Sequence, residues 1–244
     1  MEIVVKENLP NLGRYAAERF VALASDNLDR GDRFSVALSG GSTPKALYRL
    51  LSSDDFRYRI DWNRIHFFFS DERCVPADSP ESNYRLAAES LLNPLGVAEA
   101  NVFRWRGEDD PEKAASKYEF EIKSFFRSDL PVFDLILLGM GADGHTASLF
   151  PYSPAIHETK RLAVSNWVEK LTADRLTFTY PLINNAANVM LLVAGYEKAD
   201  ALREVLAGSK SIDDLPARGV QPISGSLTWV VDAPAASLLN ATEI

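Results

Sequence analysis

The chain has 244 residues, of which 46% are hydrophobic, and no linker or repeat divides it, so we expect a single domain over residues 1–244. The formal net charge of -8 argues against a general electrostatic hold on nucleic acid or on an anionic membrane, and we expect neither as a partner. The first residues lack the pattern of a secretion signal, no apolar run has transmembrane length, and the one cysteine, Cys74, excludes an intramolecular disulfide, so we expect a cytoplasmic protein.

Helical and strand patterns alternate along the chain. In chain order, they predict a helix at residues 16–28, a strand at 33–38, a helix at 45–51, a strand at 64–69, helices at 82–92 and 112–126, strands at 132–138, 162–164, 176–179 and 189–193, a helix at 197–206 and a strand at 227–231. This alternation predicts an α/β fold, a three-layer, mostly parallel Rossmann-like sheet covered by helices on both faces.

A first glycine turn, with the sequence SGGSTP, follows the first predicted strand. We expect Ser42 or Thr43 to cap the next helix and Pro44 to lie in its first turn. Backbone N–H groups around Gly40 and Gly41 would then lie at a helix N-terminus, where an anion such as phosphate is favoured. The turn lacks the G-x-x-x-x-G-K-[ST] spacing of a P-loop, which argues against a nucleoside triphosphate.

A second glycine turn, GMGADGHTASLFP at residues 139–151, follows the strand at 132–138. It contains G-x-G-x-x-G, but Pro151 and Pro154 leave no room for the helix that a dinucleotide site needs. Two interpretations remain for the turn by itself. It either holds reactive groups at the end of a strand or is a structural turn with a capping aspartate.

Among the three histidines, His145 is the strongest catalytic candidate. We expect His66 inside a buried strand and His157 in a polar loop, whereas glycine and aspartate surround His145. An imidazole in this setting can take a proton from water, and Asp143 can orient the ring or bind a substrate hydroxyl. No H-E-x-x-H, cysteine pair or G-x-S-x-G occurs, so we expect neither a metal site nor a nucleophilic serine.

Three predicted strands, at residues 33–38, 64–69 and 132–138, each end in a polar or glycine-rich turn. The carboxyl ends of parallel strands meet at one edge of a sheet, so we expect these turns to line one pocket. Asp71 follows the middle strand. It is either part of that pocket or a carboxylate that caps a loop.

These motifs together resemble the 6-phosphogluconolactonase family, whose wider superfamily includes glucosamine-6-phosphate deaminases. The resemblance is carried by residues 39–44, 71–76, 82–84 and 139–151 and continues into 175–177, 195–199 and 229–232. The deaminases resemble this chain at Asp71, Asp143 and His145 but carry a tyrosine in place of Arg73 and a glutamate in place of Phe150. An apolar Phe150 cannot supply the carboxylate that deamination needs, which favours the lactonase.

The resemblance implies an enzyme, a carboxylic ester hydrolase that converts 6-phospho-D-glucono-1,5-lactone to 6-phospho-D-gluconate in the oxidative pentose phosphate pathway without a metal or organic cofactor. It implies that His145 takes a proton from the attacking water and returns it to the departing ring oxygen. Asp143 and Asp71 are the other implied catalytic residues, and backbone N–H groups near Gly40 or Gly141 are candidates to stabilise the oxyanion.

The resemblance also implies a set of substrate- and phosphate-binding residues, namely Gly40, Gly41, Ser42, Thr43, Arg73, Arg175 and Lys198. Taken alone, Arg175 and Lys198 are equally read as ordinary surface charges. Two other functions stay open, a glucosamine-6-phosphate deaminase or isomerase and a non-catalytic sugar-phosphate binder. The expected partner is a small molecule, and the oligomeric state is open between a monomer and a small homo-oligomer.

Overall fold

A computed structural model describes residues 1–31 and 33–240, so the last four residues of the predicted domain over residues 1–244 lie outside the described part. The strands are β1 (Glu2–Lys6), β2 (Phe34–Leu38), β3 (Ile65–Phe69), β4 (Asp71–Arg73), β5 (Leu135–Gly139), β6 (Ala163–Val168), β7 (Ala173–Phe178), β8 (Asn188–Val193) and β9 (Ser226–Asp232). The α-helices are α1 (Leu9–Leu28), α2 (Ser42–Leu51), α3 (Asn83–Ala87), α4 (Asn93–Leu95), α5 (Pro111–Phe126), α6 (Tyr180–Ile183) and α7 (Ala199–Ala207). No helix within these ranges is long and apolar enough to span a membrane.

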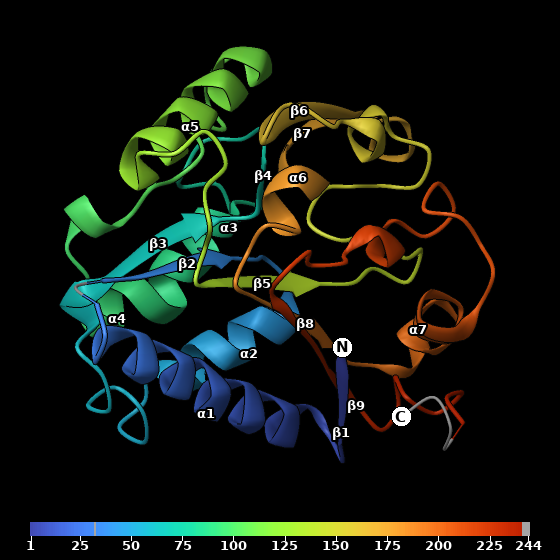
Figure 1. The fold of residues 1–244 in the computed structure, drawn as a ribbon, viewed down its shortest axis with the longest axis horizontal. Helices are drawn as coiled ribbons and strands as arrows, with labels where there is room; N and C mark the ends of the chain where they lie inside the picture. Colours follow the sequence, from blue (N-terminus) through green and yellow to red (C-terminus); the bar gives the residue numbers. More distant parts are fainter. Residues whose placement is uncertain (32, 241–244) are drawn as a thin grey trace.

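Six parallel strands form the central sheet, in the order β1-β9-β8-β5-β2-β3. Helices α1 and α2 lie on one side of this sheet, and α5, α6 and a second, smaller sheet lie on the other (Figure 1). The predicted α/β fold with a helix-covered parallel sheet is therefore confirmed. From β2 the chain proceeds to β3 on one side, and from β5 to β8 on the other, so the strand order reverses between β2 and β5.

The smaller sheet is antiparallel, with the order β4-β7-β6. The sequence predicted β6 and β7 as strands but did not separate them from the parallel sheet. A short 3₁₀ turn, η5 (Glu169–Leu171), joins them, and a connection of that length allows antiparallel pairing only. Strands β1 and β4 were not predicted. The apolar run of β1 is only three residues long, Ile3 to Val5 between two charged residues, and β4 consists of three charged residues.

Helix α2 begins earlier than the sequence predicted. Its N-cap is Gly41, whose φ of 104° suits glycine, and no side chain caps the helix. The prediction that Ser42 or Thr43 caps α2 is therefore wrong, because both residues already lie in its first turn together with Pro44. Leaving the end uncapped keeps backbone N–H groups of that turn available to a ligand.

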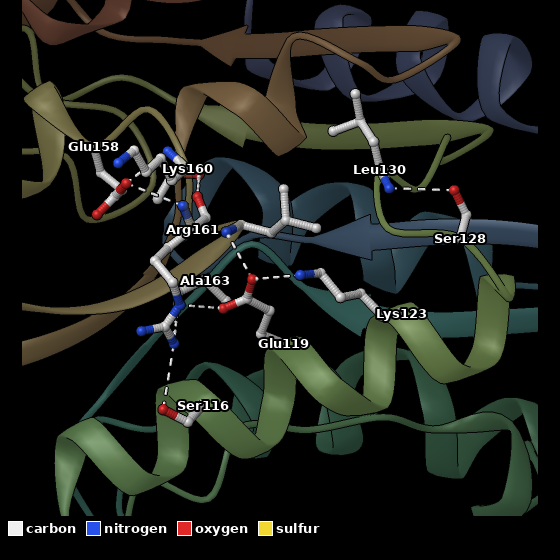
Figure 2. A network of polar contacts seen from close by, with 11 residues as sticks. Ser116, Glu119, Lys123, Ser128, Leu130, Glu158, Lys160, Arg161 and Ala163 are labelled. Carbon is white, nitrogen blue, oxygen red and sulfur yellow. Dashed lines mark hydrogen bonds and ion pairs between the residues drawn. The ribbon is translucent and has the colours of Figure 1, made fainter.

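A buried carboxylate, Glu119, joins α5 to the smaller sheet. Glu119 accepts hydrogen bonds from Arg161 Nε and from the Leu162 N–H at 3.3 Å, and its Oε1 lies 3.0 Å from Lys123 Nζ (Figure 2). Burial raises the pKa of Glu119, but the hydrogen bonds from Arg161 and Lys123 outweigh it and hold the pKa below its usual range. The carboxylate is charged, and its donors fix the helix against the start of β6.

Candidate active site

A cleft with a volume of about 240 Å³ opens at the carboxyl ends of the neighbouring strands β2 and β5, where the strand order reverses. In open α/β sheets this reversal of strand order is where ligands bind. The cleft is lined by Ser39, Gly40, Gly41, Ser42, Thr43, Pro44, Asp71, Arg73, Asn83, Gly139, Met140, Gly141, His145, Ala147, Leu192, Ala194, Glu197 and Lys198. The turns expected to meet after β2, β3 and β5 do so here.

The turn after β2 forms one wall and is held by Tyr48 of α2. The buried Tyr48 hydroxyl accepts from the Ser39 N–H at 2.9 Å and donates to the Ser39 carbonyl at 2.7 Å. Burial raises the pKa of Tyr48, so the hydroxyl keeps its proton and can donate. Ser39 is thereby fixed in place just before Gly40 and Gly41, which carry the cleft into the N-terminus of α2.

The turn after β5 brings Asp143 and His145 into contact. Asp143 Oδ1 lies 2.5 Å from His145 Nδ1 and also accepts from the His145 backbone N–H at 3.3 Å. Burial raises the pKa of Asp143, but the hydrogen bonds from His145 and Lys170 outweigh it and hold the pKa well below its usual range. The carboxylate is therefore ionised and can only accept, so Nδ1 carries the hydrogen. In this tautomer Nε2 is the ring nitrogen with a lone pair that can take a proton.

The imidazole of His145 lies between Phe150 and Gly141. The Phe150 ring is stacked on it, with centroids 4.2 Å apart and planes inclined by 20°. On the other flank, a Cβ at Gly141 would lie 2.1 Å from His145 Nδ1, so only glycine leaves room for the ring. The Gly141 N–H donates to the His145 carbonyl at 2.9 Å. Because that N–H is already used, Gly40 is the better of the two predicted oxyanion donors.

Asp71 lies at the start of β4 and is held from two directions. Its Oδ2 accepts from the Ser148 hydroxyl at 2.7 Å, and its Oδ1 accepts from Asn83 Nδ2 at 3.2 Å. Ser148 belongs to the same turn as His145, so one hydroxyl connects Asp71 to the loop of the histidine. Beyond these two hydrogen bonds the carboxylate of Asp71 has lone pairs left for a ligand hydroxyl, which fits a pocket role better than a loop cap.

The neighbouring carboxylate, Glu72, has a structural role. It is buried and accepts four hydrogen bonds, from the N–H groups of Arg73, Asn83 and Tyr84 and from the Ser82 hydroxyl. Burial raises its pKa, although these hydrogen bonds act in the opposite direction. Glu72 thus anchors the N-terminus of α3 and with it the side chain of Asn83 that holds Asp71.

The predicted cationic ligands occupy two adjoining cavities. Arg73 and Lys198 line the main cleft, whereas Arg175 lines a neighbouring cavity that shares Asp71, Arg73 and His145 with it. Arg73 and Arg175 are cross-strand partners on β4 and β7. Burial and the charge of Arg73 lower the pKa of Arg175, and an anion placed between the two guanidinium groups would relieve that repulsion.

Three side chains at the site carried no role in the sequence prediction. Asn83 and Ser148 fall inside the motifs that carry the resemblance, but only the fold shows that they hold Asp71. Lys170 of η5 has its Nζ 2.9 Å from Asp143 Oδ2, and no local sequence signal marks it. Cys74 follows Arg73 in the chain, and burial raises the pKa of its thiol to about 11, which makes it a poor nucleophile at neutral pH.

No group of three or more metal-ligating side chains comes together in the ranges 1–31 and 33–240. His66 and His157 lie away from the cleft, and His157 pairs with Asp213 at 2.8 Å. The arrangement is therefore suited to proton transfer by one imidazole next to an anion-binding surface.

A family model described as "Glucosamine-6-phosphate isomerases/6-phosphogluconolactonase" matches residues 7–229. A 6-phosphogluconolactonase of Synechocystis is 45% identical over 211 residues, which are 84% of this chain and 85% of the relative. A 6-phosphogluconolactonase of Nostoc is 42% identical over 215 residues, 85% of each chain. The solved structure of 6-phosphogluconolactonase from Trypanosoma cruzi has a TM-score of 0.87 at 31% identity and covers 98% of this chain and 97% of its own.

Proposed function

This chain belongs to the family of glucosamine-6-phosphate isomerases and 6-phosphogluconolactonases, and from that premise we propose that it hydrolyses 6-phospho-D-glucono-1,5-lactone with a water molecule activated by His145. Its activity is that of a 6-phosphogluconolactonase, a hydrolase of the pentose phosphate pathway, as the resemblance of the motifs predicted. The observation that carries the mechanism is the pairing of His145 with Asp143 beside the exposed N-terminus of α2.

The proposed reaction uses one imidazole twice. Nε2 of His145 takes a proton from water while the water oxygen attacks C1 of the lactone, which gives a tetrahedral intermediate with a negative oxygen. The intermediate collapses as the bond from C1 to the ring oxygen breaks, and the ring oxygen receives the proton from the imidazolium. The product is the open-chain acid, and Asp143 stabilises the imidazolium between the two steps.

The phosphate of the substrate is proposed to bind at the N-terminus of α2. Gly41, Ser42 and Thr43 present backbone and hydroxyl donors there, and Lys198 lines the same cleft without an ion-pair partner among the described residues. A helix N-terminus and a free ammonium group both favour a dianion. Arg73 and Arg175 complete the cationic surface on the far side of Asp71.

Asp71 is proposed to bind hydroxyl groups of the sugar. It is held by Ser148 and Asn83, so a carboxylate in a fixed orientation faces the cleft between the phosphate site and His145. Fixed acceptors of this kind set the position of the lactone carbonyl relative to the base. We propose the N–H of Gly40 as the donor to the developing oxyanion, because the N–H of Gly41 lies at the helix terminus and that of Gly141 is already bonded.

Deamination of glucosamine 6-phosphate is the rival reaction within the same family. The stacked Phe150 places an apolar ring against His145, where the deaminases carry a glutamate. A ring-opening deaminase needs that carboxylate as an acid partner, so Phe150 favours the lactonase. Release of ammonia from glucosamine 6-phosphate would count against this assignment.

The deciding experiment follows proton release from freshly generated 6-phosphogluconolactone, corrected for spontaneous hydrolysis. We expect acceleration by the wild-type protein and its loss in His145→Ala, while binding of 6-phosphogluconate by calorimetry is retained. A His145→Ala variant with the wild-type rate would remove His145 from the mechanism. Binding without turnover in the wild type would instead indicate a sugar-phosphate binder.

The remaining features of the proposal concern cofactors, partners and location. We propose that the reaction needs no cofactor, because one imidazole supplies the proton transfers and the main chain supplies the oxyanion donor. We place the enzyme in the cytoplasm with a small sugar-phosphate lactone as its partner. The oligomeric state is a question for sedimentation analysis.

A further inference from the structure

Lys170 of η5 lies at the edge of the site and has no part in the mechanism proposed above. Its Nζ is 2.9 Å from Asp143 Oδ2, the oxygen that His145 does not use. Its side chain is 70% exposed, and ion pairs of such exposed side chains contribute little to stability. The contact between Lys170 and Asp143 therefore adds little to the stability of the fold. Because Asp143 in turn contacts His145, a role for Lys170 at the site is the better explanation of the contact.

We propose that Lys170 is a positioning residue, which fixes the carboxylate of Asp143 and disfavours a positive charge on His145, so that the imidazole stays in its base form near neutral pH. This inference rests on the proposed function, in which His145 acts as the base. It adds a third member to the pair and assigns it a role in setting the pH range of the reaction.

Geometry gives the first step of the argument. Oδ1 of Asp143 accepts from His145 Nδ1 at 2.5 Å, and Oδ2 accepts from Lys170 at 2.9 Å. A carboxylate held at both oxygens cannot rotate about its bond to Cβ without losing both contacts. Since Asp143 sets the tautomer of the ring, Lys170 fixes the plane in which that hydrogen bond is made.

The hairpin that carries Lys170 is itself well defined. Thr172 adopts a left-handed conformation with φ of 49°, and its N–H donates to the Glu169 carbonyl at 3.0 Å. The Trp167 indole N–H donates to Glu169 Oε2 at 2.9 Å. The turn between β6 and β7 is therefore closed on both sides of Lys170. The contact joins this turn of the smaller sheet to the loop after β5, which carries Asp143.

Charge gives the second step. The charged groups that line the two cavities bordered by His145 are Asp143 on its own loop, Asp71 and Arg73 from β4, Lys170 from η5, Arg175 from β7, and Glu197 and Lys198 from the turn η6 (Tyr196–Lys198). Asp143 is the one that contacts the ring, and Lys170 is the cation bonded to Asp143. An unshared Asp143 would favour an imidazolium, which cannot accept a proton. Lys170 offsets this effect by like-charge repulsion.

The test compares Lys170→Met, Lys170→Arg and Lys117→Met, the last being an exposed lysine on α5 away from the site. For each variant, kcat/KM is measured from pH 5 to pH 9. Removing the cation should stabilise the protonated ring, so the acid limb of Lys170→Met should move to higher pH by about half a unit to one unit. Its rate relative to wild type should then be about 3- to 10-fold lower at pH 6 than at pH 8.5. Lys170→Arg and Lys117→Met should keep the wild-type limb.

An NMR titration of the His145 ring in the substrate-free protein gives a readout that does not depend on activity. The resonance is assigned from its loss in His145→Ala, and its midpoint should rise in Lys170→Met by the same amount. An unchanged midpoint and an unchanged acid limb would overturn the inference. A raised KM with an unchanged limb would also overturn it and make Lys170 a substrate ligand. If the wild type has no lactonase activity, the proposed function fails, and the NMR midpoint still decides the role of Lys170.

Discussion

Two carboxylates, Glu119 on α5 and Asp143 in the turn after β5, have nearly the same set of partners. Glu119 accepts from Arg161, from a backbone N–H and from Lys123, while Asp143 accepts from His145, from a backbone N–H and from Lys170. Both pKa values are lowered by these contacts despite burial. One set of contacts holds α5 to the sheet, and the other lies at the cleft.

The difference between them lies in one partner. The guanidinium of Arg161 stays charged at any physiological pH and makes further contacts to Ser116 and to a backbone carbonyl, so every group around Glu119 has a fixed state. His145 carries an imidazole, a group that can take up and return a proton in catalysis, and it lines a cleft. A carboxylate held by two side-chain donors is therefore structural or functional according to whether one of the donors can exchange a proton with a ligand.

Asp143→Asn replaces the carboxylate that contacts His145 and should have the largest effect. An amide can donate to Nδ1 and so favour the tautomer with hydrogen on Nε2, which cannot accept a proton from water. We expect kcat to fall by about 10³-fold or more, with a change of less than about 1 kcal/mol in the free energy of unfolding. Proton-release kinetics and thermal unfolding measure the two quantities. A kcat within tenfold of wild type would show that the tautomer is set by another contact.

Glu119→Gln replaces the carboxylate that holds α5 and should lower stability without lowering activity. The amide cannot pair with Arg161 and Lys123, and because these two side chains are about a third exposed we expect a loss of about 2 kcal/mol rather than the full value for a buried pair. For a domain of this size the midpoint of thermal unfolding should fall by about 4 to 8 °C. Activity per folded molecule should not change. Lys117→Met on the same helix is the matched control, and a large loss of kcat in Glu119→Gln would mean that the two clusters are coupled.

Phe150→Leu removes the aromatic ring that is stacked on His145, a contact that has no counterpart around Glu119. Losing the stacking partner should loosen the imidazole and lower kcat by about tenfold, with a loss of stability of about 1 to 2 kcal/mol. Phe133→Leu makes the same change in the core away from the cleft. It should lower stability without changing kcat, and equal kcat values for the two variants would argue against a role for the stacking.

The smallest expected effect is on the pH dependence of stability, to which Glu119 and Asp143 should contribute in the same direction. Both pKa values are lower in the folded state, so the folded state binds fewer protons than the unfolded chain in acid. The stabilisation from these two carboxylates is fully present above the ordinary carboxyl pKa of about 4. It is lost as the pH falls through the lower pKa values of the folded state. Urea unfolding between pH 3 and pH 7 should therefore show a shallower acid loss in Glu119→Gln and in Asp143→Asn. Equal slopes in all three proteins would contradict the shifts.

The parallel sheet and its glycine turns can be predicted from the sequence because their signals are local. Buried parallel strands are short apolar runs, and the turns after β2 and β5 are marked by glycines. The order of the motifs along the chain carries the family. By contrast, β4 has only three residues, all of them charged, and it is a strand because it pairs with β7 about a hundred residues later.

The contacts that tune the site cannot be predicted in the same way. Lys170 reaches Asp143 from 27 residues away, and Ser148 reaches Asp71 from 77. Each of these pairs joins two different elements, and nothing in the residues around either member indicates the other. The helix cap was missed for a local reason, since a start at Ser42 and a start at Thr43 differ by one residue, which patterns do not resolve.

The first strand of the sheet pairs with the last. Strand β1 lies along β9 in parallel register, from Glu2 beside Thr228 to Lys6 beside Asp232. During synthesis β1 therefore has no strand to pair with until some 220 residues later have left the ribosome, although α1 is already able to pack on β1 and β2. Pairing over that separation carries a large loop-closure entropy and tends to come late. β1 is thus the strand that stays unpaired for longest in a nascent chain. A chaperone that protects unpaired strands would act on this segment.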